Sequence, residues 1–584
     1  MLHLVIAAVL MAGEAGKAEA RLKADVFYLA SVECEGRGPG TDGIERAASH
    51  IARELQKAGL KPGWKGEWFQ PFGIPGSSGT LSLCSPDGHL AALKPRSHFF
   101  TVGHESSGKA AAGLVFAGFG LEQPDYDDYE DVAAKGKIVV LMRGIPRAKG
   151  WVKPAEGRKL ASMSYKIGLA RKKGAAGVLF VNDEETAASP DLPMDMSFLG
   201  TGQGKDAVPV ALVRRDIVEK MLPRGKTLKG LEAGIRKDLK PASLELKGWT
   251  AKLEAARDKE GTKLKNVVGV LEGKGPLADE TVVVGAHYDH LGWGNPQSSL
   301  SGSNKRQLHP GADDNASGTA ALLELARRFG AMPNREGRRL VFVAFSGEEL
   351  GLFGSVKYCQ EPAFPLKGTA AMFNLDMVGR APKDQKTGLA KLYVQGTGTA
   401  KPFSELVDDL AKKHGFAPTK QASGFGPSDH SSFCSKKVPV LFAWTGDHKE
   451  YHRPSDTPDL VDVKGMRRVT DLSEGAVQAL ATMARPEFIE VKGPLVRPSK
   501  GPRLGIRPGY DPEVEGVEVK GVSPGDPADK GGIKEGDRIV RIADKPVKDM
   551  AGYMNALAGV KTPGTIDVVV VRGGKEVVVK VKLE

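Results

Sequence analysis

The central part of the chain, residues 266–485, alternates wholly apolar runs with stretches whose apolar positions recur at helical spacing. Runs that are apolar at every position are typical of strands buried on both faces, and such strands joined by helices form mostly parallel sheets. The pattern therefore predicts an α/β fold, an α/β/α sandwich around a mostly parallel mixed sheet. We expect strands at 281–286, 339–345, 370–375 and 439–444, and helices at 316–329, 402–414 and 465–484.

The region before this central part has a different texture. An amphipathic stretch at 43–60 predicts a helix that packs on the central sheet in spite of its distance in sequence. Residues 77–247 then carry short β-type runs, and they hold no cluster of metal-ligand residue types. We therefore predict a β-rich module inserted after the first helix. Its expected strands are 112–119, 137–142, 177–181 and 208–213, and its one expected helix is 164–173.

A proline-rich stretch at 486–507 separates the central part from the C-terminus and predicts a linker. Beyond it, four short apolar runs are separated by turn sequences such as GDPADKGG and RGGK. The last residues are therefore predicted to form a small, compact β module. Its expected strands are 514–522, 538–542, 566–571 and 577–581.

The N-terminus combines a short apolar run with small residues that end in Ala18-Glu19-Ala20. This arrangement resembles a secretory signal with an A-x-A cleavage site, so residues 1–20 are predicted to be a signal peptide. The run is too short to span a bilayer, and no other segment approaches that length. We expect an exported protein, secreted or periplasmic, with no membrane span.

Composition adds two constraints. The formal net charge is +12 in 584 residues, but Lys and Arg are interleaved with Asp and Glu and no nucleic-acid motif is present, so no nucleic-acid partner is predicted. The four cysteines are widely scattered and contain no C-x-x-C pair. They would form at most two disulfides in an exported protein, with a pairing that the sequence does not reveal, or remain ordinary buried thiols.

Histidine and acidic residues gather in five short motifs of the central part, most of them at or just after the predicted strands. Active sites of open α/β sheets usually lie at these strand ends. Two histidines, three carboxylates and a spare glutamate are what a hydrolytic centre of two metal ions needs, and this donor set suits zinc. The motifs are GAHYDH (285–290), GADDNASG (311–318), SGEELG (346–351), NLDMVG (374–379) and EYHRPSDT (450–457).

Spacing within the first two motifs suggests a division of labour. His287 and Asp289 are two residues apart at a strand end and project to the same side, so one can bind a metal while the other orients it through a hydrogen bond. Asp313 lies on a glycine-bracketed loop before a helix and is suited to bridge two cations. Its neighbour Asp314 is expected to serve the geometry of the loop.

The remaining motifs supply a base and terminal ligands. Glu348 and Glu349 are consecutive, so their side chains diverge, and one can ligate while the other acts as a general base toward a metal-activated water. Asp376 and His452 complete the expected ligand set. In SDHSSF (428–433), Asp429 or His430 would orient substrate or form only local hydrogen bonds.

These motifs, in this order, resemble the zinc-dependent aminopeptidase family that also contains glutamate carboxypeptidase and the transferrin receptor. The resemblance covers residues 266–485 with the early helix, and it implies a zinc-exopeptidase fold with two zinc ions per chain. The family pattern leaves His290 and His309 without a role, and the HRPSDT context favours His452 over His448. The implied metal ligands are His287, Asp313, Glu349, Asp376 and His452, with Glu348 as general base and Asp289 as the aspartate that supports a ligand.

The two accessory regions resemble known modules as well. GLVFAGFG, GKIVVLMRG, AGVLFVND and VPVALV make the insert similar to a protease-associated domain, which commonly sits as a lid beside the pocket. RLGI (503–506) and SPGDPADKGGIKEGDRIVRI make the C-terminal module similar to a PDZ domain of the bacterial protease type. The predicted domains are a signal peptide at 1–20, a peptidase domain at 21–76 and 248–487, the protease-associated insert at 77–247, a linker at 488–499 and a PDZ domain at 500–584.

Together these features predict an exported zinc aminopeptidase that acts on peptide substrates, with a C-terminal peptide as a further ligand of the PDZ domain. A carboxypeptidase, a dipeptidase or a single-zinc glutaminyl cyclase would use the same scaffold. A non-catalytic receptor or adaptor is the alternative outside catalysis, and it predicts broken ligand positions. The sequence does not reveal the preferred N-terminal residue, the oligomeric state or the natural metal of each position.

Overall fold

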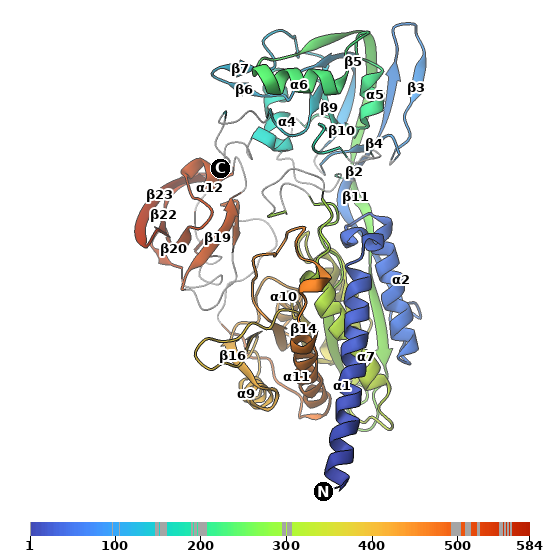
Figure 1. The fold of residues 1–584 in the computed structure, drawn as a ribbon, viewed down its shortest axis with the longest axis vertical. Helices are drawn as coiled ribbons and strands as arrows, with labels where there is room; N and C mark the ends of the chain where they lie inside the picture. The colour runs from blue at the N-terminus through green and yellow to red at the C-terminus, as the bar shows by residue number, and fades with distance from the viewer. Residues whose placement is uncertain are drawn as a thin grey trace.

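The computed structural model contains two lobes joined by a long β-ribbon, with a small module at their side (Figure 1). The lower lobe in this view is the α/β domain and the upper lobe is the insert. The structure describes residues 2–583 except 96, 104–105, 147–150, 152–159, 188–190, 192–195, 197–206, 295–298, 301–306, 492–503, 509–514, 523–525, 548–552, 554–555, 558–559 and 561–562.

The sheet of the α/β domain has four parallel strands at its centre, and this confirms the predicted fold class. The order β17-β14-β12-β13 is parallel throughout, while β15 and β11 flank it in antiparallel orientation and β16 lies parallel to β15. Its strands are β11 (Leu244–Leu271), β12 (Thr281–His287), β13 (Arg339–Phe345), β14 (Thr369–Leu375), β15 (Ala390–Gln395), β16 (Phe416–Gln421) and β17 (Val440–Trp444).

Helices cover both faces of this sheet, so its strands are buried on both faces. Val282 and Val284 belong to one hydrophobic cluster, whereas Val283 between them belongs to the cluster on the opposite face. The first face carries α1 (Leu2–Leu29), α2 (Asp42–Lys57), α7 (Gly318–Gly330), α9 (Phe403–His414) and α11 (Val463–Thr482), and the second carries α8 (Phe353–Gln360) and α10 (His430–Cys434). Short turns lie at η1 (Val32–Arg37), η2 (Ala312–Ser317), η3 (Leu366–Gly368) and η4 (Pro458–Leu460).

The ribbon of β2 (Phe69–Cys84) and β11 carries one continuous sheet from the α/β domain into the insert. The two strands pair antiparallel from Val267–Phe69 to Thr250–Cys84, with a shift in register between Asp258 and Thr262. Sequence patterns did not predict this ribbon. The predicted boundaries at residues 76 and 247 lie inside its two strands, so the domains meet along paired backbone and not at a loop. Strand β1 (Lys61–Pro62) also pairs with β11.

The insert continues the sheet with four mutually parallel strands, β5, β8, β9 and β10, and β4 pairs antiparallel with β10 at the edge. It has hydrophobic cores on both sides of these strands. Its elements are β3 (Leu90–Ala92), β4 (Phe99–Thr101), β5 (Gly108–Phe116), β6 (Glu122–Gln123), β7 (Tyr126–Asp127), β8 (Ile138–Met142), α4 (Met163–Lys172), β9 (Gly177–Val181), β10 (Val210–Val213), α5 (Arg215–Glu219) and α6 (Leu228–Asp238).

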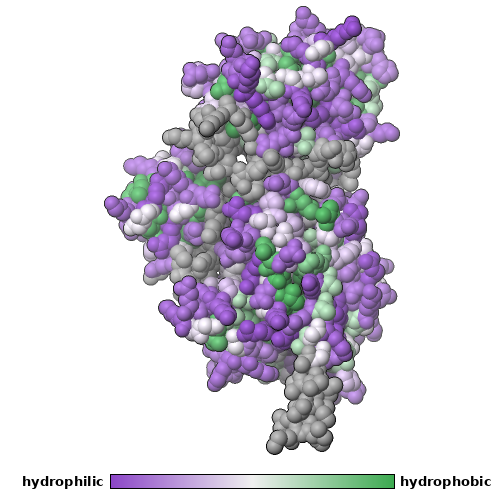
Figure 2. Space-filling model, in the orientation of Figure 1, coloured by the Kyte–Doolittle hydropathy of each residue, from purple (hydrophilic) through white to green (hydrophobic). Residues whose placement is uncertain are grey.

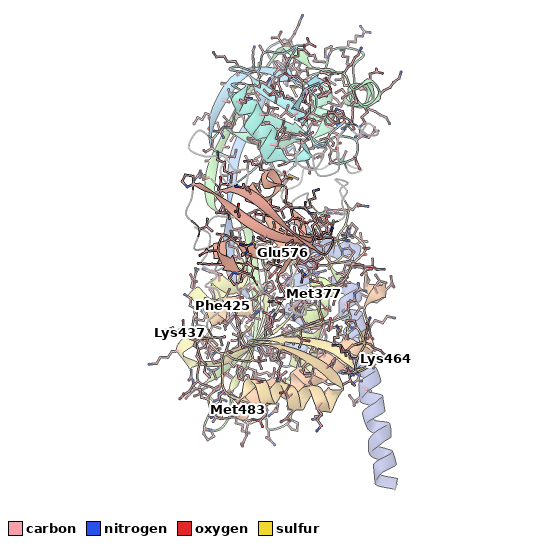
Figure 3. The ribbon with its side chains drawn as sticks, turned by 90° about the vertical axis from the view of Figure 1, so that its left-hand side faces the viewer. Met377, Phe425, Lys437, Lys464, Met483 and Glu576 are labelled. Carbon is pink, nitrogen blue, oxygen red and sulfur yellow. The ribbon has the colours of Figure 1, made fainter. Side chains whose placement is uncertain are left out.

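The C-terminal module forms a separate antiparallel sheet with its own core. Figures 1 and 3 place it beside the ribbon, at the level where the two lobes meet. Part of the predicted linker and Arg503 lie outside the described residues. Its elements are β18 (Ile506–Pro508), β19 (Val517–Val522), α12 (Pro527–Gly531), β20 (Arg538–Ile542), β21 (Lys545–Pro546), β22 (Gly564–Arg572) and β23 (Lys575–Leu583).

Helix α1 runs without interruption through the predicted cleavage site after Ala20. Arg21 donates two hydrogen bonds, of 2.8 and 2.7 Å, to the fully buried carboxylate of Glu324 in α7. On the other side of that site, Glu19 accepts a hydrogen bond from Arg467 of α11 at 3.0 Å. Within the described part of the chain, no helix has the length and apolar content needed to cross a bilayer.

On the face drawn in Figure 2, hydrophilic residues predominate and hydrophobic ones gather over the upper part of the α/β domain.

The four cysteines, all among the described residues, carry free thiols, so the disulfides that the sequence left open are not formed. Cys34, Cys359 and Cys434 are buried, as ordinary core thiols are.

Candidate metal centre

The sequence motifs converge because the strands that precede them are parallel and in register. Strand β12 ends at His287, β13 ends just before the SGEE motif, and β14 ends just before Asp376. Since the carboxyl ends of parallel strands share one edge of the sheet, these motifs meet there. Met377, labelled in Figure 3, follows Asp376 and lies in the half of the α/β domain that is nearer to the insert.

A first group of ligand atoms surrounds the buried imidazole of His287. Its Nε2 lies 3.2 Å from Oδ1 of Asp376 and 3.4 Å from Oδ1 of Asp314. Oε2 of Glu348 is 4.0 Å from the same nitrogen. His287, Asp314 and Asp376 thus offer an imidazole nitrogen and two carboxylate oxygens, all within 4.8 Å of one another, and each of the three residues is buried.

A second group lies on the other side of Asp314. Oδ2 of Asp314 is 3.2 Å from Nε2 of His452, and the same nitrogen lies 3.0 Å from Oε2 of Glu349. Nδ1 of His290 is 2.6 Å from Oε1 of Glu349 and 3.7 Å from Oδ2 of Asp314. Asp314 therefore faces one group with each of its carboxylate oxygens, as a residue that bridges two cations must.

The structure does not bring Asp313 to either group; Asp314, and not Asp313 as predicted, is the aspartate that faces both. Oδ1 of Asp313 accepts hydrogen bonds from the backbone amide of Gly379 at 2.6 Å and from Oγ of Ser317 at 2.9 Å. Its Oδ2 lies 3.2 Å from Nε2 of His448. The side chains of adjacent residues diverge, and the sequence alone has no signal that tells which of two neighbouring aspartates faces the strand ends.

Asp289 supports the glutamate pair, although in a different way from the one predicted. Its Oδ1 accepts from the backbone amide of Glu348 at 3.2 Å, and its Oδ2 accepts from that of Glu349 at 3.4 Å. Nδ1 of His287 lies closer to the backbone carbonyl of Asp289, at 3.2 Å, than to its carboxylate, at 3.8 Å. The carboxylate thus fixes the backbone that carries both glutamates, and the carbonyl orients the imidazole.

His290 belongs to the second group of ligand atoms, although sequence reasoning assigned it no role. It is fully buried, and it directs Nδ1 at Glu349. Its position one residue after Asp289, at the end of the GAHYDH motif, was the available signal. The chain leaves the strand conformation after His287, so the alternation that would have turned His290 away no longer holds.

Electrostatics at the two groups is dominated by buried opposite charges. Burial lowers the pKa of His287, but the carboxylates of Asp376 and Glu348 outweigh it and raise that pKa well above its ordinary value. Burial raises the pKa of Asp314, yet the three surrounding histidines hold it well below the usual range. A site that keeps carboxylates ionised in a buried place attracts cations.

The two adjacent glutamates titrate in opposite directions. Burial raises the pKa of Glu349, but His452 and His290 lower it to about 2. Burial raises the pKa of Glu348 well above its ordinary value, and repulsion from Glu349 and Asp376 adds to this effect although His287 opposes it. Two carboxyl groups whose environments separate their pKa values are suited to different roles, one as a ligand and one as a proton carrier.

Polar residues behind the first group are buried as well. Burial raises the pKa of Asp429 to about 7 and lowers that of His430 to about 3. Nε2 of His430 lies 3.2 Å from Oε1 of Gln395, and its ring stacks on Phe442 with centroids 4.4 Å apart. His430 is thus held in the core and does not point at the ligand groups. His309 also has a local partner, since its Nε2 is 2.8 Å from Oγ of Ser299.

The donor set fits zinc. Imidazole nitrogens and carboxylate oxygens are its usual ligands in hydrolytic sites, and both groups combine the two kinds around a shared aspartate. No cysteine takes part in either group. The arrangement can therefore hold two cations, with Asp314 between them, and it leaves Glu348 beside the first of them.

Comparisons with known proteins agree with this geometry. Residues 266–477 match the family described as Peptidase family M28, residues 107–221 match the PA domain, and residues 498–583 match the PDZ domain. The resemblances drawn from the sequence motifs are thereby confirmed. The central domain is an M28 peptidase domain, and the insert and the C-terminal module are a PA domain and a PDZ domain.

Several peptidases are similar to this chain in sequence or in structure. Aminopeptidase YwaD of Bacillus subtilis (strain 168) is 28% identical over 471 residues, which cover 78% of this chain and 84% of that protein. A probable leucine aminopeptidase of Arthroderma otae is 27% identical over 248 residues, 41% of this chain and 64% of that protein. The solved structure of a zinc aminopeptidase from Bacillus subtilis aligns with a TM-score of 0.46 at 24% identity, covering 81% of this chain and 98% of that one.

The different positions of Asp313 and Asp314 lead to a test. We expect Asp314→Asn to weaken zinc binding by more than the roughly 10- to 100-fold that is typical when an outer-shell partner is lost, because one group loses its oxygen ligand and both lose the negative charge of the carboxylate. Asp313→Asn, the matched control, should lower the affinity by no more than about tenfold, since Asp313 contacts Gly379, Ser317 and His448, none of which belongs to either group. Competition with a chromophoric chelator measures both constants, and equal losses in the two variants would contradict the assignment.

Proposed function

Because this chain carries an M28 peptidase domain joined to a PA domain and a PDZ domain, we propose that it is an exported zinc aminopeptidase that removes N-terminal residues from peptides. The observation that carries this proposal is the position of Asp314, which faces a ligand group with each carboxylate oxygen while Glu348 stands beside the first group. The similarity to an aminopeptidase of Bacillus subtilis and to a probable leucine aminopeptidase of Arthroderma otae supports the direction of cleavage.

The two groups divide the expected ligands. His287 and Asp376 would hold one zinc ion, and Glu349 and His452 the other, with Asp314 shared by both. When bound, the pair supplies Lewis-acid polarisation of a carbonyl and acidifies a water toward neutral pH. The second group contains two imidazoles, because His290 also reaches Glu349. Its Nδ1 lies closer to Glu349 than to Asp314, which fits a residue that orients the Glu349 carboxylate.

Glu348 is the proton carrier in this proposal. Its side chain is almost buried, so its carboxylate is poorly solvated and accepts a proton readily. The backbone amide of Glu348 donates a hydrogen bond of 3.2 Å to the carboxylate of Asp289, which fixes the position of Glu348. The backbone amide of Glu349 donates to the same carboxylate. Glu348 takes a proton from the attacking water and returns it to the departing amine of the product.

Other reactions on the same scaffold remain as competing hypotheses. A carboxypeptidase or dipeptidase would recognise a free carboxylate of the substrate, and a glutaminyl cyclase would need only one zinc ion. The shared Asp314 favours two ions. A receptor-like adaptor predicts disrupted ligand positions, whereas the expected donors converge here with Asp314 in place of Asp313.

The role of Glu348 gives the sharpest test. We expect Glu348→Gln to bind two zinc ions with unchanged affinity while kcat toward an aminoacyl-anilide falls by about 10²- to 10⁴-fold, the usual worth of a general base. Glu361→Gln just after α8 is the control, because among the described residues its carboxylate pairs with Lys357 at the surface and belongs to neither ligand group. Turnover within a factor of three of the unaltered protein would exclude Glu348 as the base.

The same assay separates the competing hypotheses. An aminopeptidase should cleave the free aminoacyl-anilide and lose at least a hundredfold in kcat/KM on its N-acetylated form. Release of the C-terminal residue from an N-acetylated peptide with a free carboxylate would favour the carboxypeptidase, and a stoichiometry of one zinc ion per chain would favour the cyclase.

Export rests on residues 1–20, of which residues 2–20 form the first part of α1. Cleavage after Ala20 would remove the Glu19–Arg467 contact but keep both hydrogen bonds from Arg21 to Glu324, so the rest of α1 stays anchored to α7. We expect N-terminal sequencing of the protein from a fractionated host to begin at Arg21, outside the cytoplasm. An uncleaved chain confined to the cytoplasm would contradict export.

The PDZ domain is proposed to bind a free peptide carboxylate by addition of a strand. Among the described strands of its sheet, β18 lies at the edge, and Gly505 just before it adopts φ +77° in the turn that leads into the strand. An edge strand offers unpaired backbone groups to an incoming peptide. Titration of the full chain with peptides should show binding that C-terminal amidation weakens at least tenfold. A broad panel without any binding would remove the proposal.

A further inference from the structure

Arg37, in the N-terminal segment, is one of the two largest fully buried side chains of the described chain, and none of the chemistry above uses it. It is the last residue of η1 and lies 248 positions before Gly285, where the first of the five motifs begins. Its exposed fraction is 0%, and its backbone adopts φ +48°. Burying a guanidinium costs free energy unless every donor has a hydrogen-bond partner. The partners of Arg37 therefore indicate which parts of the fold it holds together.

All of the partners are backbone carbonyls. Nε donates to Tyr288 at 2.7 Å, and Nη1 donates to Leu29 at 2.6 Å and to Pro310 at 2.7 Å. Nη2 donates to the carbonyl of Gly311 at 2.8 Å and, more weakly, to that of Asp314 at 3.5 Å. The five donors of the guanidinium thus meet five carbonyls, and none of these acceptors is a carboxylate.

Four of these carbonyls belong to the two loops that carry proposed zinc ligands. Tyr288 stands between His287 and Asp289, while Pro310, Gly311 and Asp314 form the loop that presents the bridging carboxylate. The backbone of the same segment adds to the connection. The carbonyl of Arg37 accepts from the amide of His290 at 3.2 Å, and that of Gly36 accepts from Gly292 at 3.0 Å.

The local geometry leaves no room for a different arrangement. At Gly36, which has φ +59°, an added Cβ would lie 2.4 Å from the carbonyl oxygen of His309 and 2.6 Å from that of Gly292. The segment therefore lies directly against both loops. Carboxylates of Asp314, Asp289 and Asp456 lie near enough to act on the buried guanidinium through space. Arg37 thus also places a positive charge beneath an acid-rich site.

We propose that Arg37 is a positioning residue of the zinc centre, which holds the His287 loop and the Asp314 loop together so that their ligand atoms are preorganised for the two ions. The proposal rests on the proposed function for the identity of the metal. Arginine suits the task because its planar fork offers five donors in fixed directions, whereas lysine offers three from a single nitrogen. A shift of about 1 Å between two ligand loops is enough to impair a site.

The chain contains a matched control in Arg338. This side chain is equally buried, and it also bonds to backbone carbonyls, those of Leu480 at 2.8 Å and Met483 at 2.7 Å, together with Glu280 at 2.6 Å. It precedes β13, so it lies at the end of that strand opposite to the zinc motifs. Arg37→Lys and Arg338→Lys therefore make the same chemical change at equal burial.

We expect Arg37→Lys in the full chain to weaken zinc binding by about 10- to 100-fold, the range typical of lost outer-shell support, and to lower kcat more than it raises KM. Arg338→Lys should keep zinc affinity within a factor of two, even where both variants lower the thermal midpoint in EDTA to a similar degree. Unchanged zinc affinity in Arg37→Lys would overturn the proposal. Zinc affinity does not depend on which substrate is cleaved, so this outcome is separate from a failure of the proposed function.

A measurement on the unaltered protein decides the matter if Arg37→Lys does not fold. Hydrogen exchange in EDTA should already protect the amides of residues 288–292 and 311–316, because Arg37 and not the metal organises these loops. Zinc should then add little protection there. Free exchange of both segments in EDTA, with protection only after zinc is added, would overturn the proposal as well.

Discussion

The carboxylate of Asp314 has to face two groups of ligand atoms at once, and this geometric requirement shapes much of the α/β domain. One oxygen lies 3.4 Å from His287 and the other 3.2 Å from His452, residues that are far apart in sequence. The parallel strands bring His287, Glu349 and Asp376 to one edge of the sheet, because their carboxyl ends coincide. Asp314 comes to the same place on a loop, so its position depends on what holds that loop.

The loop is held by contacts from distant parts of the chain. Asp456 accepts the amides of Asp313 and Asp314 at 2.9 and 3.1 Å, and it is in turn held by Arg380 at 2.9 Å. Arg37 satisfies carbonyls on the other side. Buried acids and bases are costly, and Asp314, Asp456 and Arg37 each meet groups of opposite charge or backbone groups at hydrogen-bond distance. The result is a buried cluster of acidic and imidazole groups, which suits divalent cations.

The accessory domains are attached in two different ways. The PA domain shares its sheet with the peptidase domain through the β2–β11 ribbon, so backbone hydrogen bonds run without a break from one domain into the other. The PDZ domain instead has a separate sheet and core and follows a proline-rich stretch. The PA domain is thus joined to the peptidase domain by two paired strands, and the PDZ domain follows the peptidase domain along a single stretch of chain.

The apolar periodicity determined most of the regular elements. The expected strands at 177–181, 339–345 and 538–542 coincide with β9, β13 and β20, because each is a short apolar run with polar or glycine-rich neighbours. The ribbon was missed because β2 contains Pro71, Pro75 and three glycines, which are unusual inside strands. β11 alternates polar and apolar residues, but this pattern was not recognised as the partner of β2 because the two strands are far apart in sequence.

The motifs likewise determined which kinds of side chain form the site, since acidic residues and histidines after parallel strands have to meet at one edge. The choice between Asp313 and Asp314, and the parts taken by His290 and Arg37, were decided by tertiary structure. These choices depend on the directions of side chains in irregular loops, where neither helical nor strand periodicity applies. Such directions are set by hydrogen bonds to residues hundreds of positions away, and a linear pattern does not record them.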